Sequence, residues 1–399
     1  MNIEIKKGIA SGRIKAPPSK SYAHRLLISA ALANGKSKIS GIINSVDMQA
    51  TLDCISALGV EYARDGEEVS VLGGKFNNFH RSFNCHESGS TLRFFIPIAL
   101  ALTDNAKFIG AKRLIERGIT AYEEIFSKKG ITVEKTQNEI NLSGRLTAGE
   151  YHISGNVSSQ FISGLIFALP LLSGDSKIVI TTELESEAYV DVTIEAVKCF
   201  GIQINRQGNE IFIKGNQSYQ PREISVEGDA SNSAFLDAFN YLGGDVSVLG
   251  INEKTIQPDY VYKSYFEKLN NENPTLSLKN CPDLGPVCFM LAALKNGATF
   301  KDTKRLAIKE SDRAMAMKEE LSKLGARVDV FENEAVVYKT ENLKENMELS
   351  CHNDHRIAMA LAVSLSTLGG TLKDCECVSK SYPHFFEDLK SLGIICKEI

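Results

Sequence analysis

The segment SKSYAHRLLISAALANGKSKISGIINSVDMQATLDCISALGVEYARDGEEVSVL, residues 19–72, contains one copy of a pattern that recurs along the chain. A short polar cluster opens it, and the spacing of apolar residues then predicts helices, while alternation predicts strands. The expected elements are a helix over 21–33, a strand over 37–42, a helix over 48–58, and strands over 60–63 and 68–72. Gly59 ends the second helix, and Asp65-Gly66 suits a hairpin turn between the two strands.

Six stretches open in this way, each with a polar or charged cluster before an apolar, Ala/Leu-rich helix. They are Ser19-Lys20-Ser21, Glu87-Ser88-Gly89-Ser90, Ser158-Ser159-Gln160, Asp229-Ala230-Ser231, Asp283-Leu284-Gly285 and Asp354-His355-Arg356. The steps from Ser19 through Ser88, Ser158, Asp229 and Asp283 to Asp354 are 69, 70, 71, 54 and 71 residues. Repetition at a nearly fixed period predicts six structural units.

The units share further elements. A glycine ends an amphipathic helix at Gly59, Gly130, Gly201, Gly325 and Gly393, whereas the fourth unit has a helix over 260–269 followed by Asn270-Asn271. In the third unit we expect a helix over 160–171, a strand over 177–181, a helix over 190–200, and strands over 202–205 and 210–213; in the fifth, the corresponding ranges are 285–295, 298–302, 311–324, 326–331 and 335–338. One such unit cannot close a core alone, so the units must pack together.

The six units divide into two groups of three. The shortest step follows the fourth opening, and the stretch 216–223 (NQSYQPRE) has the composition of a linker. We therefore place a boundary near residue 226.

Composition narrows the class of protein. The 399 residues are 43% hydrophobic and 24% charged, with a net charge of −4, which is typical of a globular protein and argues against nucleic acid or a membrane surface as the partner. The N-terminal residues include no apolar stretch of signal-peptide length, so we expect a cytoplasmic protein. The nine cysteines are scattered and include no CxxC motif, so we expect them to be reduced thiols. The run Cys351-His352-Asn353-Asp354-His355 lacks further ligands at a recognised spacing, and no metal site is expected there.

The openings concentrate the candidate chemistry. Helix N-termini carry partial positive charge and free N–H groups, so several of them together suit an anion. Lys20, Ser21 and Arg25 add an ammonium, a hydroxyl and a guanidinium to the first opening. A capped surface helix with solvated cations is the alternative interpretation.

Each remaining cluster also has a structural interpretation. Ordinary N-capping would explain Ser158 and Asp354, and a cap is favoured over a base for Asp283. Within Lys309-Glu310-Ser311-Asp312-Arg313 the charges would share one face if the segment were helical, which is typical of a salt-bridged surface helix but also of an acid/base held among cations. The joint pattern favours function, because cations recur at or beside the openings: Lys20, Arg25, Arg93, Arg117, Lys309, Arg313, Arg356 and Lys380. They predict a small ligand with several negative charges.

Six motifs together resemble the enolpyruvyl transferase family, most closely its branch that acts on shikimate 3-phosphate. They are PPSKSYAHR, SSQF, ELESEAYVDVT, KESDR, NDHRIAM and VSKSYPHFFEDL, and they span nearly the whole chain. The resemblance implies an α/β fold, a two-lobed inverted αβ barrel or prism with three βαβαββ units in each lobe. It also implies an N-terminal lobe over 15–226, mainly on the shikimate-phosphate side. A C-terminal lobe of 1–14 plus 227–399 would contain the acid/base pair and part of the phosphoenolpyruvate site.

The resemblance also implies which residues bind and react. Shikimate 3-phosphate would be bound by Lys20, Ser21, Arg25, Ser158, Ser159, Gln160, Ser186, Tyr189, Asp283 and Lys309. Phosphoenolpyruvate would be bound by Lys20, Gly89, Arg117, Gln160, Arg313, Arg356 and Lys380. Asp283 would remove the proton of the 5-hydroxyl, and Glu310, with Lys20, would protonate the methylene carbon.

The implied reaction transfers the enolpyruvyl group to the 5-hydroxyl through a tetrahedral intermediate and releases phosphate, a step of the shikimate pathway toward chorismate and aromatic amino acids. Neither a metal nor an organic cofactor is implied, and we expect a monomer. Four positions depart from the family pattern, namely Glu87, Gly118, Glu187 and Arg305. Glyphosate sensitivity therefore stays open, and no phosphate contact is assigned to Arg305.

Three competing interpretations are weaker. UDP-N-acetylglucosamine enolpyruvyl transferase typically has Lys-Asn where this chain has Lys20-Ser21 and a cysteine near 110–118, but no cysteine lies between Cys85 and Cys199. A non-catalytic anion-binding relative would not need both Asp283 and Glu310. An RNA-end cyclase on a related repeat fold would be expected to have a more basic surface.

Overall fold

The computed structural model describes residues 1–399 except 77, 78 and 272. Within this part of the chain the strands form six sheets, five with four strands and one with two. Helices and strands alternate in the order that the sequence predicts, so the expectation of a mixed α/β fold with six repeated sheet–helix units is confirmed. None of the described helices is long and apolar enough to cross a membrane.

The chain divides into two compact bodies. We call Pro18–Glu227 the N-terminal lobe and Met1–Pro17 together with Gly228–Ile399 the C-terminal lobe. Each has its own apolar core. Three of the six sheets belong to each lobe.

The N-terminal lobe contains three complete units. Its elements are α1 (Lys20–Leu32), β3 (Gly35–Ser40), α2 (Val46–Ala57), β4 (Glu61–Asp65), β5 (Glu68–Gly73), β6 (Ser82–Asn84), α3 (Gly89–Leu102), β7 (Asn105–Ile109), α4 (Lys112–Glu116), α5 (Thr120–Lys128), β8 (Thr132–Lys135), β9 (Glu139–Ser143), β10 (Gly149–Ile153), α6 (Ser159–Ala168), the 3-10 helix η1 (Leu169–Leu171), β11 (Ser176–Ile180), α7 (Glu187–Cys199), β12 (Ile204–Gln207), β13 (Glu210–Ile213) and β14 (Glu223–Ser225). Most predicted boundaries agree to within one to three residues.

The C-terminal lobe contains the other three units. Its elements are β1 (Ile3–Ile5), β2 (Ser11–Lys15), α8 (Ala230–Asp237), η2 (Ala238–Leu242), β15 (Asp245–Leu249), η3 (Pro258–Val261), α9 (Tyr262–Leu269), β16 (Thr275–Ser277), η4 (Pro282–Leu284), α10 (Gly285–Leu294), β17 (Ala298–Lys301), η5 (Lys304–Ile308), α11 (Arg313–Lys323), β18 (Val328–Val330), β19 (Glu334–Val337), β20 (Met347–Ser350), α12 (His355–Leu368), β21 (Gly370–Lys373), η6 (Cys375–Lys380), α13 (Phe385–Ser391) and β22 (Cys396–Glu398). The fourth unit, where the repeat step is short, has only the two-stranded sheet β15-β2.

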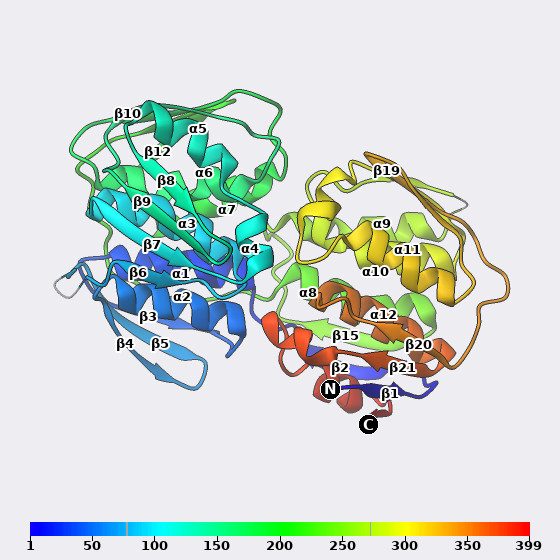
Figure 1. Ribbon diagram of the computed structural model, residues 1–399. Coiled ribbons are helices and arrows are strands. Elements are labelled where there is room, and N and C mark those ends of the chain that lie inside the picture. The colour runs from blue at the N-terminus through cyan, green and yellow to red at the C-terminus, as the bar shows by residue number, and fades with distance from the viewer. Residues whose placement is uncertain (77–78, 272) are drawn as a thin grey trace. The chain divides into compact units, whose positions relative to one another are not determined.

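All five four-stranded sheets share one topology. In the order β6-β7-β9-β8, for example, the first two strands are parallel and the last three are antiparallel neighbours. Distant segments complete the first and last sheets. Strand β14 lies parallel to β3, with Glu223 opposite Lys38, and β1 lies between β21 and β22, with Ile3 opposite both Leu372 and Glu398 (Figure 1). Strand β2 pairs with β15, so the first fifteen residues complete two sheets of the C-terminal lobe.

The helices that follow the repeat openings lie inside each lobe. In α3, 12 of the 14 residues are buried, and in α12, 13 of the 14 are buried, so both helices are covered on all sides. The strands instead alternate between buried and partly buried residues, as in β11 and β9, so one face of each sheet covers the helices. Helices inside and sheets outside make the buried helix N-termini the places where polar groups must gather.

The five predicted glycine turns follow from backbone geometry. Gly59, Gly130, Gly201, Gly325 and Gly393 have φ between 70° and 90°, a left-handed conformation that glycine adopts without steric cost. The fourth helix, α9, ends at Leu269 and Asn270 takes a right-handed conformation, so no glycine is required there.

Candidate active site

Arg25 is the most buried cation at the first opening. Its guanidinium donates to Thr193 Oγ1 at 2.7 Å, to the Ser21 carbonyl at 2.7 Å and to the Tyr189 carbonyl at 3.1 Å, and it lies 5.1 Å from the centre of the Phe94 ring. Burial lowers the pKa of Arg25 to about 10. All three hydrogen-bond partners are neutral oxygens, and among the described residues no carboxylate forms an ion pair with this buried positive charge. Such a group favours an anionic ligand.

Lys20 and Ser21 lie in the first turn of α1, as predicted. Lys20 Nζ forms an ion pair with Asp47 Oδ2 at 2.7 Å, and Asp47 lies in the first turn of α2. Ser19 is the N-cap residue but its side chain makes no capping hydrogen bond. The first helix of the repeat therefore begins with its backbone N–H groups uncapped by a side chain.

Gly89 begins α3 beside two guanidinium groups. A Cβ atom at Gly89 would lie 2.9 Å from Arg93 Nη1 and 3.2 Å from Arg117 Nη1, so this position admits only glycine unless both side chains move. Arg93 Nη1 donates to Gln160 Oε1 at 2.6 Å, and Gln160 Nε2 donates to Ser90 Oγ at 2.9 Å. The fold thus brings together Gly89, Arg117 and Gln160, three of the residues expected to bind phosphoenolpyruvate.

Two further helix starts in the N-terminal lobe carry predicted residues. Ser158 caps α6 by accepting from the backbone N–H of Gln160, and Ser159 is buried in the first turn. Ser186 precedes α7 in a left-handed conformation with φ 54°, and such backbone strain clusters at functional sites. Tyr189 lies in the first turn of α7, where its carbonyl accepts from Arg25.

Arg313 is the centre of the cluster in the C-terminal lobe. Its side chain is 1% exposed and donates to three carboxylates, namely Asp354 through Nε at 2.9 Å, Asp283 through Nη1 at 2.7 Å and Glu310 through Nη2 at 2.8 Å. These bonds use all three nitrogens of the guanidinium. The pKa of Arg313 stays well above its usual value because the three carboxylates outweigh the effect of burial.

Asp283 is held ionised by several cations. Its Oδ1 accepts from Lys309 Nζ at 3.1 Å and from Arg313, and its Oδ2 lies 3.7 Å from Arg356 Nη2. Burial alone would raise the pKa of Asp283, but Lys309, Arg313 and Arg356 hold it well below the usual value. Burial lowers the pKa of Lys309, although Asp283 opposes that shift.

The segment before α11 differs from the prediction. We expected a helix over 311–324, but α11 begins at Arg313, because Asp312 is its N-cap and accepts from the backbone N–H of Met315 at 3.1 Å. Lys309 is extended, so Lys309 and Arg313 do not share a helical face. They converge on Asp283 through tertiary packing instead.

Asp354 is both a helix cap and a partner of Arg313. Its Oδ1 accepts from the backbone N–H of Arg356 at 2.9 Å, and its Oδ2 accepts from Ser311 Oγ at 3.1 Å. Arg356 Nη1 donates to Asn232 Oδ1 at 2.7 Å, so the fourth opening supports the site through a residue that the sequence analysis did not select. Lys380 Nζ donates to the Asn353 carbonyl at 2.8 Å.

The positions that depart from the family pattern have structural explanations in two cases. Gly118 has φ 71°, which proline cannot adopt, so the backbone after Arg117 differs from one built on Arg-Pro. The carboxylate of Glu187 pairs with Arg206. Arg305 is buried in η5 of the C-terminal lobe, and Glu87 lies partly exposed in the turn before α3.

Sequence reasoning counted Arg93 among the cations of an anion site but assigned it to neither substrate, and it gave no site role to Asn232 or Asp354. Arg93 had a detectable signal, since it is a cation one turn into an apolar helix. Asp354 was expected as a cap, and its second role depends on Arg313, 41 residues earlier in the chain. Asn232 carries no signal, because an amide near a helix start is common.

Comparison with known proteins identifies the family. The family described as EPSP synthase (3-phosphoshikimate 1-carboxyvinyltransferase) matches residues 6–389. The chain belongs to the EPSP synthase family. A 3-phosphoshikimate 1-carboxyvinyltransferase of Clostridioides difficile (strain 630) is 41% identical, with 98% of this chain and 97% of the relative covered. The same enzyme of Clostridium beijerinckii is also 41% identical, with 100% of this chain and 98% of the relative covered.

Solved structures share the fold of this EPSP synthase family member. The EPSP synthase of Acinetobacter baumannii matches with a TM-score of 0.78 at 20% identity, covering 100% of both chains. The enolpyruvyl transferase NikO of Streptomyces tendae matches with a TM-score of 0.77 at 16% identity, covering 99% of this chain and 98% of that one. The two-lobed architecture with six units is thus that of enolpyruvyl transferases.

The different surroundings of Arg25 and Arg313 predict losses of stability of different size for the same substitution. Arg313→Met leaves three carboxylates without their shared cation and should destabilise the protein by about 3–5 kcal/mol. Arg25→Met removes a buried charge whose partners are neutral, and should cost about 1 kcal/mol or less. Urea unfolding of both variants measures the difference, and equal losses would contradict the distinction between them.

Proposed function

We propose that this chain transfers the enolpyruvyl group of phosphoenolpyruvate to the 5-hydroxyl of shikimate 3-phosphate and releases phosphate. Membership of the EPSP synthase family supports the reaction. The observation that carries the residue assignment is the pair of carboxylates, Asp283 and Glu310, bound to the same buried Arg313. The Arg313 guanidinium thus fixes the positions of both groups, so that Asp283 can act as the base and Glu310 as the acid.

We assign shikimate 3-phosphate to the residues that the resemblance implies. They are Lys20, Ser21, Arg25, Ser158, Ser159, Gln160, Ser186, Tyr189, Asp283 and Lys309. The buried, uncompensated charge of Arg25 supports a phosphate there, because a phosphate would neutralise the cation and accept further N–H bonds from the start of α1.

We assign phosphoenolpyruvate to Lys20, Gly89, Arg117, Gln160, Arg313, Arg356 and Lys380. The guanidinium of Arg117 beside Gly89 supports this assignment, because glycine lets an anion approach the backbone closely. Arg93 is added as a residue that orients Gln160. Arg313 already donates to three carboxylates, so a substrate carboxylate or phosphate would share or replace one of these bonds.

Asp283 is the base in this proposal, and its environment must change during the cycle. A carboxylate with a pKa well below its usual value is a weak base. The phosphates and carboxylates of the bound substrates would interact with Lys309, Arg313 and Arg356. These cations would then stabilise the Asp283 carboxylate less than they do without substrates. Substrate binding therefore raises the basicity of Asp283 when the 5-hydroxyl is present.

The steps balance with the groups assigned. The 5-hydroxyl oxygen forms a bond to C2 of phosphoenolpyruvate as Asp283 accepts its proton and Glu310, with Lys20, delivers a proton to the methylene carbon. The tetrahedral intermediate then loses a proton from the new methyl group to Glu310, and the bond from C2 to the phosphate oxygen breaks. Cations around both substrates stabilise the charge that develops on the leaving phosphate.

We further propose that the chain acts as a monomer in the cytoplasm. All nine cysteines are free thiols and eight of them are buried, which fits a reducing compartment.

The reaction predicts a strict substrate requirement. Purified protein should release phosphate from phosphoenolpyruvate only when shikimate 3-phosphate is added, because the acceptor hydroxyl starts the reaction. A colorimetric phosphate assay measures this, with UDP-N-acetylglucosamine as the comparison acceptor. Release driven by the UDP-sugar would instead assign the chain to the sister activity.

The acid/base assignment predicts large losses of turnover. Asp283→Ala and Glu310→Ala should each lower kcat by at least about 100-fold, the usual scale for a positioned acid or base. Glu332→Gln, which changes an exposed carboxylate of the same lobe, is the control and should leave kcat unchanged. Near-normal turnover in either alanine variant would reject the role assigned to that residue.

A further inference from the structure

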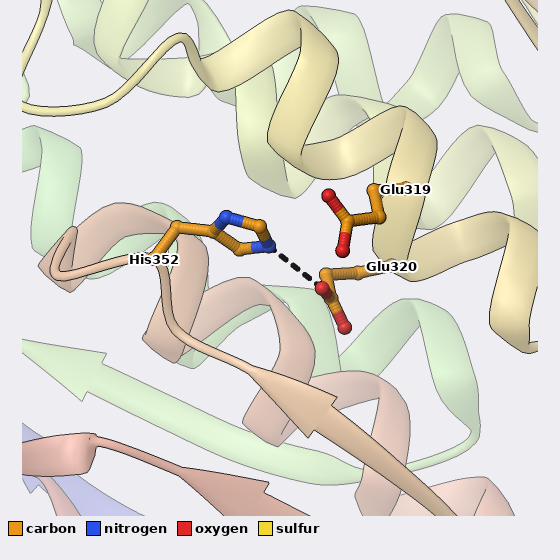
Figure 2. A group of neighbouring side chains, drawn as sticks. All are labelled: Glu319, Glu320 and His352. Carbon is orange, nitrogen blue, oxygen red and sulfur yellow. Dashed lines mark hydrogen bonds and ion pairs between the residues drawn. The ribbon is translucent and has the colours of Figure 1, made fainter.

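Glu320 is a buried carboxylate that the proposed mechanism does not use. It lies on α11, its side chain is fully buried, and three groups bond to it. Its Oε2 accepts from the backbone N–H of Ser350 at 2.9 Å, and its Oε1 lies 2.7 Å from Lys323 Nζ. Figure 2 shows the third contact, 2.6 Å between Glu320 Oε1 and His352 Nε2. Two of the three partners are Ser350, the last residue of β20, and His352, in the segment that joins β20 to α12.

That segment has a strained backbone. His352 and Asn353 are consecutive residues with φ of 50° and 53°, a left-handed conformation that costs non-glycine residues on the order of 1–3 kcal/mol each. Surrounding interactions must therefore fix it. Glu320 bonds to Ser350, which precedes the strained pair, and to His352, which is its first residue. This carboxylate is therefore placed to fix the conformation of the segment.

The strained segment leads directly into the phosphoenolpyruvate groups. The Asn353 carbonyl accepts from Lys380 Nζ, and the Asp354 carboxylate accepts from Arg313 Nε. The first turn of α12 follows and contains Arg356. Three cations assigned to phosphoenolpyruvate thus depend on the two residues that follow His352.

The same side chains also resemble a metal site. One ligand atom each of Glu319, Glu320 and His352 lies within 4.8 Å of the others. However, the ammonium of Lys323 lies 2.7 Å from Glu320 Oε1 and 3.5 Å from Glu319 Oε1, where it offsets part of their negative charge. A metal ion would have to displace this cation and the His352 hydrogen bond. The contacts favour a structural carboxylate over a metal ligand.

We propose that Glu320 is a positioning residue for phosphoenolpyruvate, acting through Ser350 and His352 on the segment that presents Asn353 and Asp354. This inference rests on the proposed roles of Arg313, Arg356 and Lys380. Loss of the carboxylate lets the strained pair relax toward ordinary backbone angles. The Asn353 carbonyl and Asp354 then move, and Lys380 and Arg313 lose their orientation.

Steady-state kinetics of Glu320→Ala and Glu320→Gln test the proposal. Glu320→Ala should raise the KM for phosphoenolpyruvate by about 10-fold or more, the scale on which small displacements act, while the KM for shikimate 3-phosphate changes by less than about 3-fold. Glu320→Gln keeps an oxygen for the Ser350 N–H and should recover most of the affinity. Lys323→Met removes the ion pair but neither loop contact, and should stay within about 2-fold of wild type.

A second variant guards against a Glu320→Ala protein that does not fold. His352→Gly suits a φ of 50° and removes the imidazole bond to Glu320, so it should fold and still raise the KM for phosphoenolpyruvate. An unchanged KM in His352→Gly, with Glu320→Ala unfolded or unchanged, would overturn the proposal.

Two further measurements separate the alternatives. Lys380→Ala, measured in parallel, should raise the KM for phosphoenolpyruvate; if it does not, the site assignment fails rather than the positioning role. Wild-type protein should keep its KM after dialysis against a chelator. A loss of affinity that added Zn²⁺ restores would assign Glu319, Glu320 and His352 to a metal and overturn the proposal.

Discussion

The buried guanidinium of Arg313 is the interaction on which the C-terminal half of the site depends. It joins Asp283 from the start of the fifth unit, Glu310 from the segment before α11 and Asp354 from the start of α12. Three carboxylates around one cation would repel one another without it, and Lys309 and Arg356 complete the neutralisation at Asp283. The cluster therefore fixes both the position and the charge of the base and acid that we assign.

The repeat architecture explains why such groups can gather. Each lobe has its apolar helices inside and its sheets outside, so a helix start in the interior carries N–H groups that need partners. Capping side chains satisfy some of them, as at Ser88, Ser158 and Asp354. Cations and hydroxyls also lie at these starts, and a phosphate or carboxylate can interact with both at once. The lobe around Arg25 illustrates the point, because that cation has only neutral partners.

Much of the fold could be predicted from the sequence, because periodicity is a local property. The glycine turns and the alternation in β3 and β13 identified the units, whereas the two-stranded sheet of the fourth unit was not predicted. The start of α11 was misplaced because Asp312 caps the helix where the charges of 309–313 suggested continuity. Asn232 and Glu320 could not be found, since their importance comes from Arg356 and His352, residues that only the folded chain brings to them.

The charge state of Asp283 tests the account most directly. Infrared difference spectra between wild type and Asp283→Asn, recorded without substrates from about pH 7 to about pH 4.5, isolate the signal of this one carboxyl group. Because Lys309, Arg313 and Arg356 hold its pKa well below the usual value, the account predicts an ionised carboxylate over the whole range. A protonated carboxyl signal that grows in by about pH 5, present in wild type and absent from Asp283→Asn, would contradict it.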